Sequence, residues 1–309
     1  MIRAAVLSGG GVKGAFQVGA LQSAMLDHNL FCNKWFGTST GALQACIMSD
    51  GITLEAQKAR ANKLNDIYRN IKGNKDIFDG PSNDLTKGIA LLNMQFGKRQ
   101  SLYEPNGLKR LIDTYFHPEV SFSNDVLAVG VVDFNRRTSH VIEGLGEQYI
   151  KDFILASASM PVYFPPVNIY GANYIDGGVR DQTLLQPAVE WLIQQDPDNN
   201  QLKELLVILT QPLTPKPVLS KTDKLLDKLS TTLDIMVNEV FMNDLKAITK
   251  KNAASSNGDP RYRHITIRLI QPPTYYNATL EFDPKLINRM IEDGLKAPIE
   301  IIEYPHSLP

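Results

Sequence analysis

Short apolar runs alternate along this chain with longer segments in which apolar residues recur every three or four positions. The short runs predict strands and the longer segments predict helices, because these are the periods at which side chains of each element share a face. Strands are expected at 2–7, 34–37, 126–132, 139–143, 167–170, 205–210 and 264–270. Helices are expected at 15–27, 40–49, 54–70, 107–115, 148–156 and 184–195, and over two longer stretches at 222–251 and 284–302.

This alternation of strand and helix favours an α/β fold, with a mostly parallel central sheet between helices in three α/β/α layers. The sequence contains no internal repeat and no low-complexity segment. The proline-rich stretch at 211–217 is interpreted as a stiff connector, because a predicted strand ends just before it. We therefore expect a single domain over 1–309, with a helical C-terminal portion packed on the sheet.

A glycine-rich loop, Ser-Gly-Gly-Gly-Val-Lys-Gly at 8–14, joins the first predicted strand to the first predicted helix. Its unobstructed backbone N–H groups would form a cradle for an anion. Three interpretations stay open: a dinucleotide fingerprint, an oxyanion hole and a tight turn without a ligand. The fingerprint uses Gly9, Gly11 and Gly14, but no predicted strand ends at the acidic Asp27 that it needs. A Walker loop is excluded, because alanine follows Gly14 where lysine is required.

The next predicted strand runs into Gly37-Thr38-Ser39-Thr40-Gly41, a G-x-S-x-G pentapeptide followed by a predicted helix. A serine at such a strand-to-helix junction lies on a sharp turn, which the flanking glycines permit, and its hydroxyl is pushed out of the sheet. The start of the following helix offers free N–H groups and positive potential to a developing oxyanion. Together with the glycine loop, the pentapeptide favours the oxyanion-hole interpretation, with Ser39 as a nucleophile.

A third element, Asp176-Gly177-Gly178, follows a short apolar segment. Taken alone, it is typical of an ordinary Asp-Gly turn. An aspartate that acts as a base also needs such a position, because a tight turn fixes the carboxylate and glycines leave it uncovered. Asp176 is therefore the candidate general base.

The segments 8–14, 37–41 and 176–178, in this order, resemble the patatin-like phospholipase family. The stretch Ala-Ser-Ala-Ser-Met-Pro-Val-Tyr-Phe-Pro-Pro at 156–166 also resembles the segment that this family carries before its catalytic aspartate. The resemblance covers about residues 2–186. It implies a patatin-like α/β fold and a lipid acyl hydrolase.

The resemblance also implies a Ser–Asp dyad, with Ser39 as nucleophile and Asp176 as base, and an acyl-enzyme intermediate. The N–H groups of Gly10, Gly11 and Thr40 would hold the oxyanion, supported by Gly9, Lys13, Gly14, Gly37, Gly41, Gly177 and Gly178. Two positions depart from the family pattern, since Ser8 replaces the usual aspartate and Lys13 the usual arginine. Neither change removes a backbone N–H, but lysine lacks the planar fork of arginine.

A dyad needs no histidine, and the five histidines at 28, 117, 140, 264 and 306 lie in no setting that marks a triad base. Folding could still bring one of them close. An aspartate is a weak base at its reference pKa of ~3.9, so the site must either raise this pKa, as a partly dry pocket would, or rely on positioning.

Composition narrows the classes of partner. Hydrophobic residues make up 43% and charged residues 21% of the chain, with a net charge of −1, so no global field attracts nucleic acid or an anionic membrane. Cys32 and Cys46 are expected as buried thiols, and we expect neither a metal nor a cofactor. No signal peptide or membrane-spanning run is recognisable, which makes a cytoplasmic location the default and leaves signal-free secretion open.

The expected partner is a lipid ester substrate, and the oligomeric state is left open. The apolar stretch 84–96, followed by Lys98 and Arg99, could be a flap that lines an acyl pocket or touches a membrane surface transiently. It could equally be an amphipathic helix with its apolar side in the core. Two other functional classes remain: a nucleotide-binding protein that uses the glycine loop, and a catalytically silent binding protein of hydrolase fold.

Overall fold

A nine-stranded sheet forms the centre of the computed structural model, which describes residues 1–116, 125–144, 147–213, 225–259 and 261–307. The strands are β1 (Ile2–Leu7), β2 (Lys34–Thr38), β3 (Leu127–Asp133), β4 (Thr138–Glu143), β5 (Val167–Ile169), β6 (Ala172–Asp176), β7 (Lys203–Ile208), β8 (Ile265–Ile270) and β9 (Glu300–Ile302).

Hydrogen-bonded neighbours follow the order β5-β6-β3-β2-β1-β7-β8-β9, and β4 pairs with β3. The central strands β3, β2, β1, β7 and β8 run parallel to one another. The strands β4, β5, β6 and β9 pair antiparallel with their neighbours. Every residue of β1, β2, β3 and β7 is buried, as expected where helices cover both faces of a parallel sheet. The predicted α/β class with a mostly parallel central sheet is confirmed.

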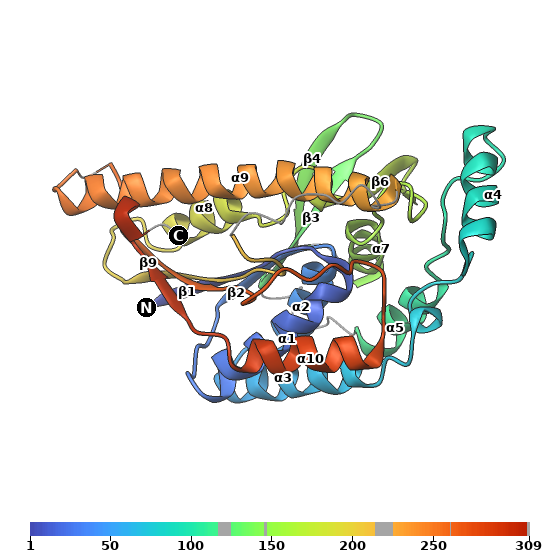
Figure 1. The fold of residues 1–309 in the computed structure, drawn as a ribbon. Helices are drawn as coiled ribbons and strands as arrows, with labels where there is room; N and C mark the ends of the chain where they lie inside the picture. The colour runs from blue at the N-terminus through green and yellow to red at the C-terminus, as the bar shows by residue number, and fades with distance from the viewer. Residues whose placement is uncertain (117–124, 145–146, 214–224, 260, 308–309) are drawn as a thin grey trace.

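Helices cover both faces of the sheet. They are α1 (Gly14–Leu26), α2 (Thr40–Ser49), α3 (Leu54–Arg69), α4 (Asp84–Gln95), α5 (Asn106–Tyr115), α7 (Glu147–Ser157), α8 (Leu185–Gln194), α9 (Leu225–Ser256) and α10 (Pro284–Leu295). In Figure 1, α8 and α9 lie on one face, whereas α1, α3 and α10 lie on the other. Short 3-10 helices are η1 (Gly11–Lys13), η2 (Asn74–Asp76), η3 (Gly177–Val179) and η4 (Pro305–Ser307).

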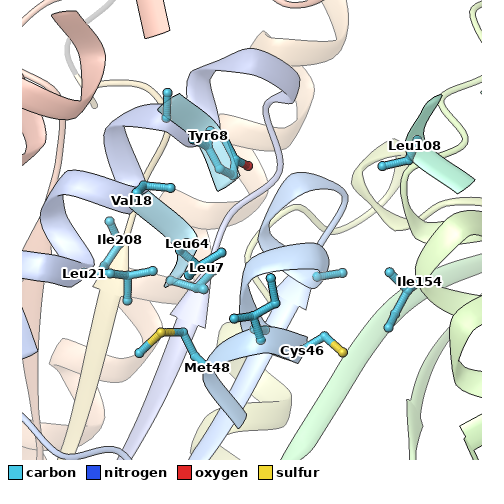
Figure 2. Packing of buried hydrophobic residues seen from close by; sticks show 14 of the residues in the cluster. Leu7, Val18, Leu21, Cys46, Met48, Leu64, Tyr68, Leu108, Ile154 and Ile208 are labelled. Atoms are coloured by element: carbon cyan, nitrogen blue, oxygen red, sulfur yellow. The ribbon is translucent and has the colours of Figure 1, made fainter. Parts of the chain in front are cut away.

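Alternation along β1 divides the core between the two faces. Ala5 and Leu7 belong to the cluster under α1, α2 and α3, whereas Ala4 and Val6 belong to the cluster under α8 and α9. Figure 2 shows Leu7 close to side chains of the first cluster. Successive strand residues point to opposite faces, so the first strand anchors both helical layers.

The sequence predictions for the elements fail at two places and are otherwise close. The helix predicted over 284–302 ends at Leu295, and β9 follows after Pro298, because a proline disfavours helical conformation in the residue before it. The strand β6, which carries Asp176, was not predicted. The first residues of the helix predicted at 222–251 and most of the connector at 211–217 lie outside the described residues.

Candidate active site

Ser39 occupies a strained turn between β2 and α2. Its φ of 56° and ψ of −126° lie where residues other than glycine are uncommon. The turn is tight, because a Cβ on Gly37 would stand 2.3 Å from the carbonyl oxygen of Gly41, and one on Gly41 would stand 2.2 Å from that of Leu7. The pentapeptide glycines are therefore required sterically, as the sequence predicted for a sharp strand-to-helix turn.

A buried serine from a distant helix holds this turn. The Ser39 N–H donates to the hydroxyl oxygen of Ser157 at 2.9 Å, and the Ser157 hydroxyl donates to the carbonyl oxygen of Gly130 at 2.7 Å. Ser157 is the last residue of α7 and is fully buried. The strained backbone of Ser39 is thereby tied to β3, the neighbour of β2.

Strand register brings Asp176 to Ser39. The last residue of β2, Thr38, lies opposite Gly130, and Asp176 lies opposite the next residue, Val131. Because β4 pairs with β3 from Ala128 to Asp133, β2 and β6 must share the other edge of β3. The two strands approach each other end to end along that edge, so the residue after β2 and the last residue of β6 meet.

The carboxyl group of Asp176 is buried and only half satisfied. Its Oδ1 accepts a hydrogen bond of 2.7 Å from the Gly178 N–H, whereas Oδ2 has no partner at hydrogen-bonding distance among the described residues. Burial raises the pKa of Asp176 from 3.8 to about 7, and the Gly178 N–H and the nearby Ser39 hydroxyl offset the rise only in part. An ionised Asp176 at this position is a stronger base than a free aspartate.

The glycine loop lies directly against Ser39. A Cβ on Gly9 would stand 3.0 Å from the Ser39 Cβ, and Gly11 has a φ of 61° with the carbonyl oxygen of Thr279 only 2.2 Å from its Cβ position. A side chain at Gly11 would therefore be both strained and obstructed. Within the described part of the chain, the N–H groups of Gly10, Gly11 and Thr40 donate to no protein acceptor.

Polar side chains brace the loop from behind. The Ser8 hydroxyl oxygen accepts a hydrogen bond of 3.0 Å from the Thr210 N–H, which links the ends of β1 and β7. The Gln182 side-chain amide donates to the Gly9 carbonyl oxygen at 2.9 Å. Lys13 is buried, with its ammonium 5.7 Å from the centre of the Tyr275 ring. Serine at position 8 thus has a structural role in this chain.

The helices after the two loops also fit closely together. A Cβ on Gly14 would stand 2.5 Å from the Thr40 hydroxyl oxygen, so glycine allows α1 to lie against the start of α2. The Gly14 carbonyl oxygen accepts a 2.8 Å hydrogen bond from the Gln44 amide, and the Tyr68 hydroxyl bonds both Thr40 and Gln44 at 2.9 Å. This network fixes Thr40 relative to the glycine loop.

A cleft of about 1230 Å³, which includes space open to solvent, extends from Ser39 and Asp176 into the molecule. Much of its lining is apolar and comes from α3 and α5. The apolar side chains that line it include Leu64 and Ile67 of α3, Ile71 just after α3, Leu108 and Leu111 of α5, and Phe282. Such a mostly apolar cleft with a few convergent polar groups at one end is typical of a small-molecule site.

The structure bears on four further expectations. No residue of 84–96 lines the cleft, so the prediction of a flap that forms an acyl pocket is wrong. Of the histidines, none of the four in the described ranges lines the cleft, and His117 lies outside those ranges. Asp27 caps the end of α1 instead of ending a strand, which removes the acidic residue of a dinucleotide fingerprint. Cys32 and Cys46 are buried free thiols, as expected.

The geometry agrees with what the comparison with protein families finds. The model of the family described as patatin-like phospholipase matches residues 5–189. The chain belongs to the patatin-like phospholipase family. The family is one of lipid acyl hydrolases, and the matched segment contains the glycine loop, the serine turn and the aspartate. No curated protein sequence matches the chain. Among the residues that the structure describes, no helix has both the length and the apolarity needed to cross a membrane.

Two solved structures are similar to this patatin-like chain. VipD from Legionella pneumophila has 14% sequence identity and a TM-score of 0.44, with 95% of this chain and 65% of that one covered. A chain of the heterodimeric ExoU–SpcU complex from the type III secretion system of Pseudomonas aeruginosa has 17% identity and a TM-score of 0.34. There the coverage is 79% of this chain and 52% of the other. This patatin-like chain therefore spans less than two thirds of either.

Sequence reasoning missed the residues that position Ser39. Gly130 interrupts the apolar strand β3, and a glycine inside a strand is a signal of close backbone approach. A Cβ there would stand 2.8 Å from the Thr38 hydroxyl oxygen. Ser157 lies in the stretch 156–166 that carries part of the family resemblance, but nothing local indicates that it bonds residue 39.

Proposed function

We propose that this protein hydrolyses lipid esters, with Ser39 as nucleophile and Asp176 as its general base. The observation that carries the proposal is the buried, unpartnered Oδ2 of Asp176 at the end of β6, next to the strained serine. A carboxylate oxygen without a partner is costly to bury, and a proton from the Ser39 hydroxyl would satisfy it. Asp176 would thus take the serine proton as Ser39 attacks the ester carbonyl.

The free N–H groups around Ser39 support the same chemistry. Attack on the carbonyl creates a negatively charged oxygen, and the N–H groups of Gly10, Gly11 and Thr40 would donate to it. Collapse of this intermediate would release the alcohol or lysolipid, leave an acyl group on Ser39 and return the proton from Asp176 to the leaving oxygen. Asp176 would then take a proton from water as the water attacks the acyl-enzyme, and would return it to the Ser39 oxygen as the fatty acid leaves.

The shape of the cleft supports an ester with a long acyl chain. The cleft that contains Ser39 is lined by apolar side chains of α3 and α5, and such a lining suits a hydrocarbon chain. An acyl chain in this part of the cleft would bury its methylene groups, each worth about 0.8 kcal/mol. Such esters occur in aggregated lipid, so the expected substrate source is a membrane or micelle surface.

A serine-directed fluorophosphonate tests the proposal in one experiment. We expect stoichiometric labelling of Ser39, and we expect Ser39→Ala to lose both labelling and hydrolysis of a soluble p-nitrophenyl ester. Ser159→Ala is a matched control, because Ser159 is also buried but its hydroxyl donates to the Leu155 carbonyl oxygen. No labelling of the wild-type chain would favour a silent binding protein, and labelling of another serine would refute the assignment of Ser39.

A further inference from the structure

The helix α4 belongs to an excursion, residues 80–103, that leaves the body of the molecule and returns to the same place. Its ends are joined, because Asp79 and Glu104 exchange two backbone hydrogen bonds of 2.9 Å. In Figure 1, α4 stands apart from the helical layers that cover the sheet. The helix begins with a complete capping box at Asn83 and Thr86, so its start is locally stabilised.

The outward face of α4 consists of large apolar side chains in contact with solvent. Leu85 is 75% exposed and Phe96 is 71% exposed, and Ile89 and Leu92 between them are also exposed. These positions repeat at intervals of four, three and four residues, which places them along one side of the helix. The opposite side already packs inward through Ala90. A contiguous exposed apolar face of this kind marks an interaction surface.

The base of the excursion is part of the cleft wall. The Leu102 and Tyr103 N–H groups each donate at 2.8 Å to the carbonyl oxygens of Val162 and Tyr163. Tyr163 and the adjacent Phe164 both line the cleft. These hydrogen bonds therefore hold the base of the excursion, and with it α4, close to the cleft that contains Ser39.

The charged residues of this helix and the segment after it are mainly cationic. Residues 84–99 contain three cationic residues, Lys87, Lys98 and Arg99, and one acidic residue, Asp84. A short helix with a large apolar face and flanking cations is suited to lie in the plane of a membrane interface, and each cation adds attraction to anionic headgroups. A second protein copy would need a complementary anionic, apolar groove instead.

We propose that the outward face of α4 (Leu85, Ile89, Leu92 and Phe96) docks this protein on a lipid bilayer that contains anionic headgroups. The inference deepens the proposed function, on which it rests, because docking would hold the cleft at the surface where lipid esters are found. The apolar side chains would enter the interface, while the exposed Lys98, just after the helix, would meet lipid phosphates.

Vesicle flotation of the Ser39→Ala chain tests this proposal without consuming the lipid. Vesicles are made of phosphatidylcholine, with or without phosphatidylglycerol. We expect Leu85→Ser combined with Phe96→Ser to lower partitioning at least about tenfold. Lys98→Gln should weaken only the preference for phosphatidylglycerol, and added salt should have the same effect. The matched control changes two other exposed apolar residues to serine. These are Leu202, just before β7, and Ile235 of α9, which are 76% and 65% exposed.

Two results would overturn the docking surface. One is vesicle partitioning that the α4 variant leaves unchanged, or that the control variant lowers as much, with melting temperatures unaltered. The other is a concentration-dependent dimer that the α4 variant dissociates, since a second copy would then cover this face. Fluorophosphonate labelling is scored separately on the wild-type chain, so vesicle binding without labelling of the wild-type chain would refute the proposed hydrolase and leave the docking surface standing.

Discussion

Ser39 and Asp176 reach the same site by opposite routes. Ser39 lies on a turn that five consecutive residues define, and its strain is imposed by the close approach of Gly37 and Gly41. Asp176 arrives on a short strand whose position depends on pairing with Val131, 45 positions earlier by residue number. The serine is positioned mainly by local geometry, whereas the aspartate is positioned by register and tuned by burial. The two residues should therefore fail differently when each is perturbed.

The largest effect is expected when the base is removed and the turn is kept. Asn at position 176 can still accept the Gly178 N–H but cannot take the serine proton, so kcat on a soluble ester should fall ~10²–10⁴-fold. His140→Gln serves as the control, since His140 pairs with the other edge of β3, and it should retain activity within about tenfold. A folded histidine variant as inactive as Asp176→Asn would contradict the dyad.

Relative to wild type, Asp176→Asn should stabilise the fold more and more as pH rises. With a pKa of about 7 in the folded state against 3.8 normally, wild-type Asp176 contributes stability below pH 3.8 and loses it as pH rises towards 7. Asparagine has no such loss, so Asp176→Asn should gain on the order of 4 kcal/mol over wild type at pH 8. Urea unfolding at pH 4.5 and pH 8 measures this gain, and an equal gain at both values would show that burial does not tune the carboxyl.

A smaller effect is expected when the serine turn loses its brace. Ser157→Ala removes the acceptor of the Ser39 N–H, so kcat should fall about 10- to 100-fold through misplacement of the nucleophile. The KM for a soluble ester should change little, because Ser157 does not line the cleft. A fall in kcat that Ser159→Ala reproduces would instead mean general loosening of this segment.

The smallest expected effect is on the pH midpoint of kcat/KM, which should depend on Asp176 and not on the placement of Ser39. Because burial raises the pKa of Asp176 to about 7, kcat/KM should fall about tenfold for each unit below that pH as the base becomes protonated. The profile for Ser157→Ala should keep the same midpoint, since that change alters placement of the serine rather than burial of the aspartate. A shifted midpoint in Ser157→Ala would show that the two routes are coupled.

The contrast between local and long-range control also explains what the sequence could predict. The strand 2–7, the helix 40–49 and the turn at Ser39 follow from periodicity and from glycines within a few residues of each other. The strand β6 is only five residues long, and antiparallel pairing with β3 creates it; no local period indicates it. The hydrogen bond between Ser39 and Ser157 joins residues 118 positions apart. The exposure of α4 depends on where the rest of the chain folds, so neither feature follows from nearby residues.

The joined ends at Asp79 and Glu104 set the helix α4 apart from the rest of the molecule. Since two backbone hydrogen bonds close the excursion at its base, α4 could be shortened or exchanged without moving the strands that carry Ser39 and Asp176, as long as Leu102 and Tyr103 keep their hydrogen bonds to Val162 and Tyr163. Loop closure costs change slowly with length, so the rest of the fold would tolerate such editing. If α4 is the docking surface, the membrane preference could change by replacement of this helix alone, while the residues around Ser39 and Asp176 stay the same.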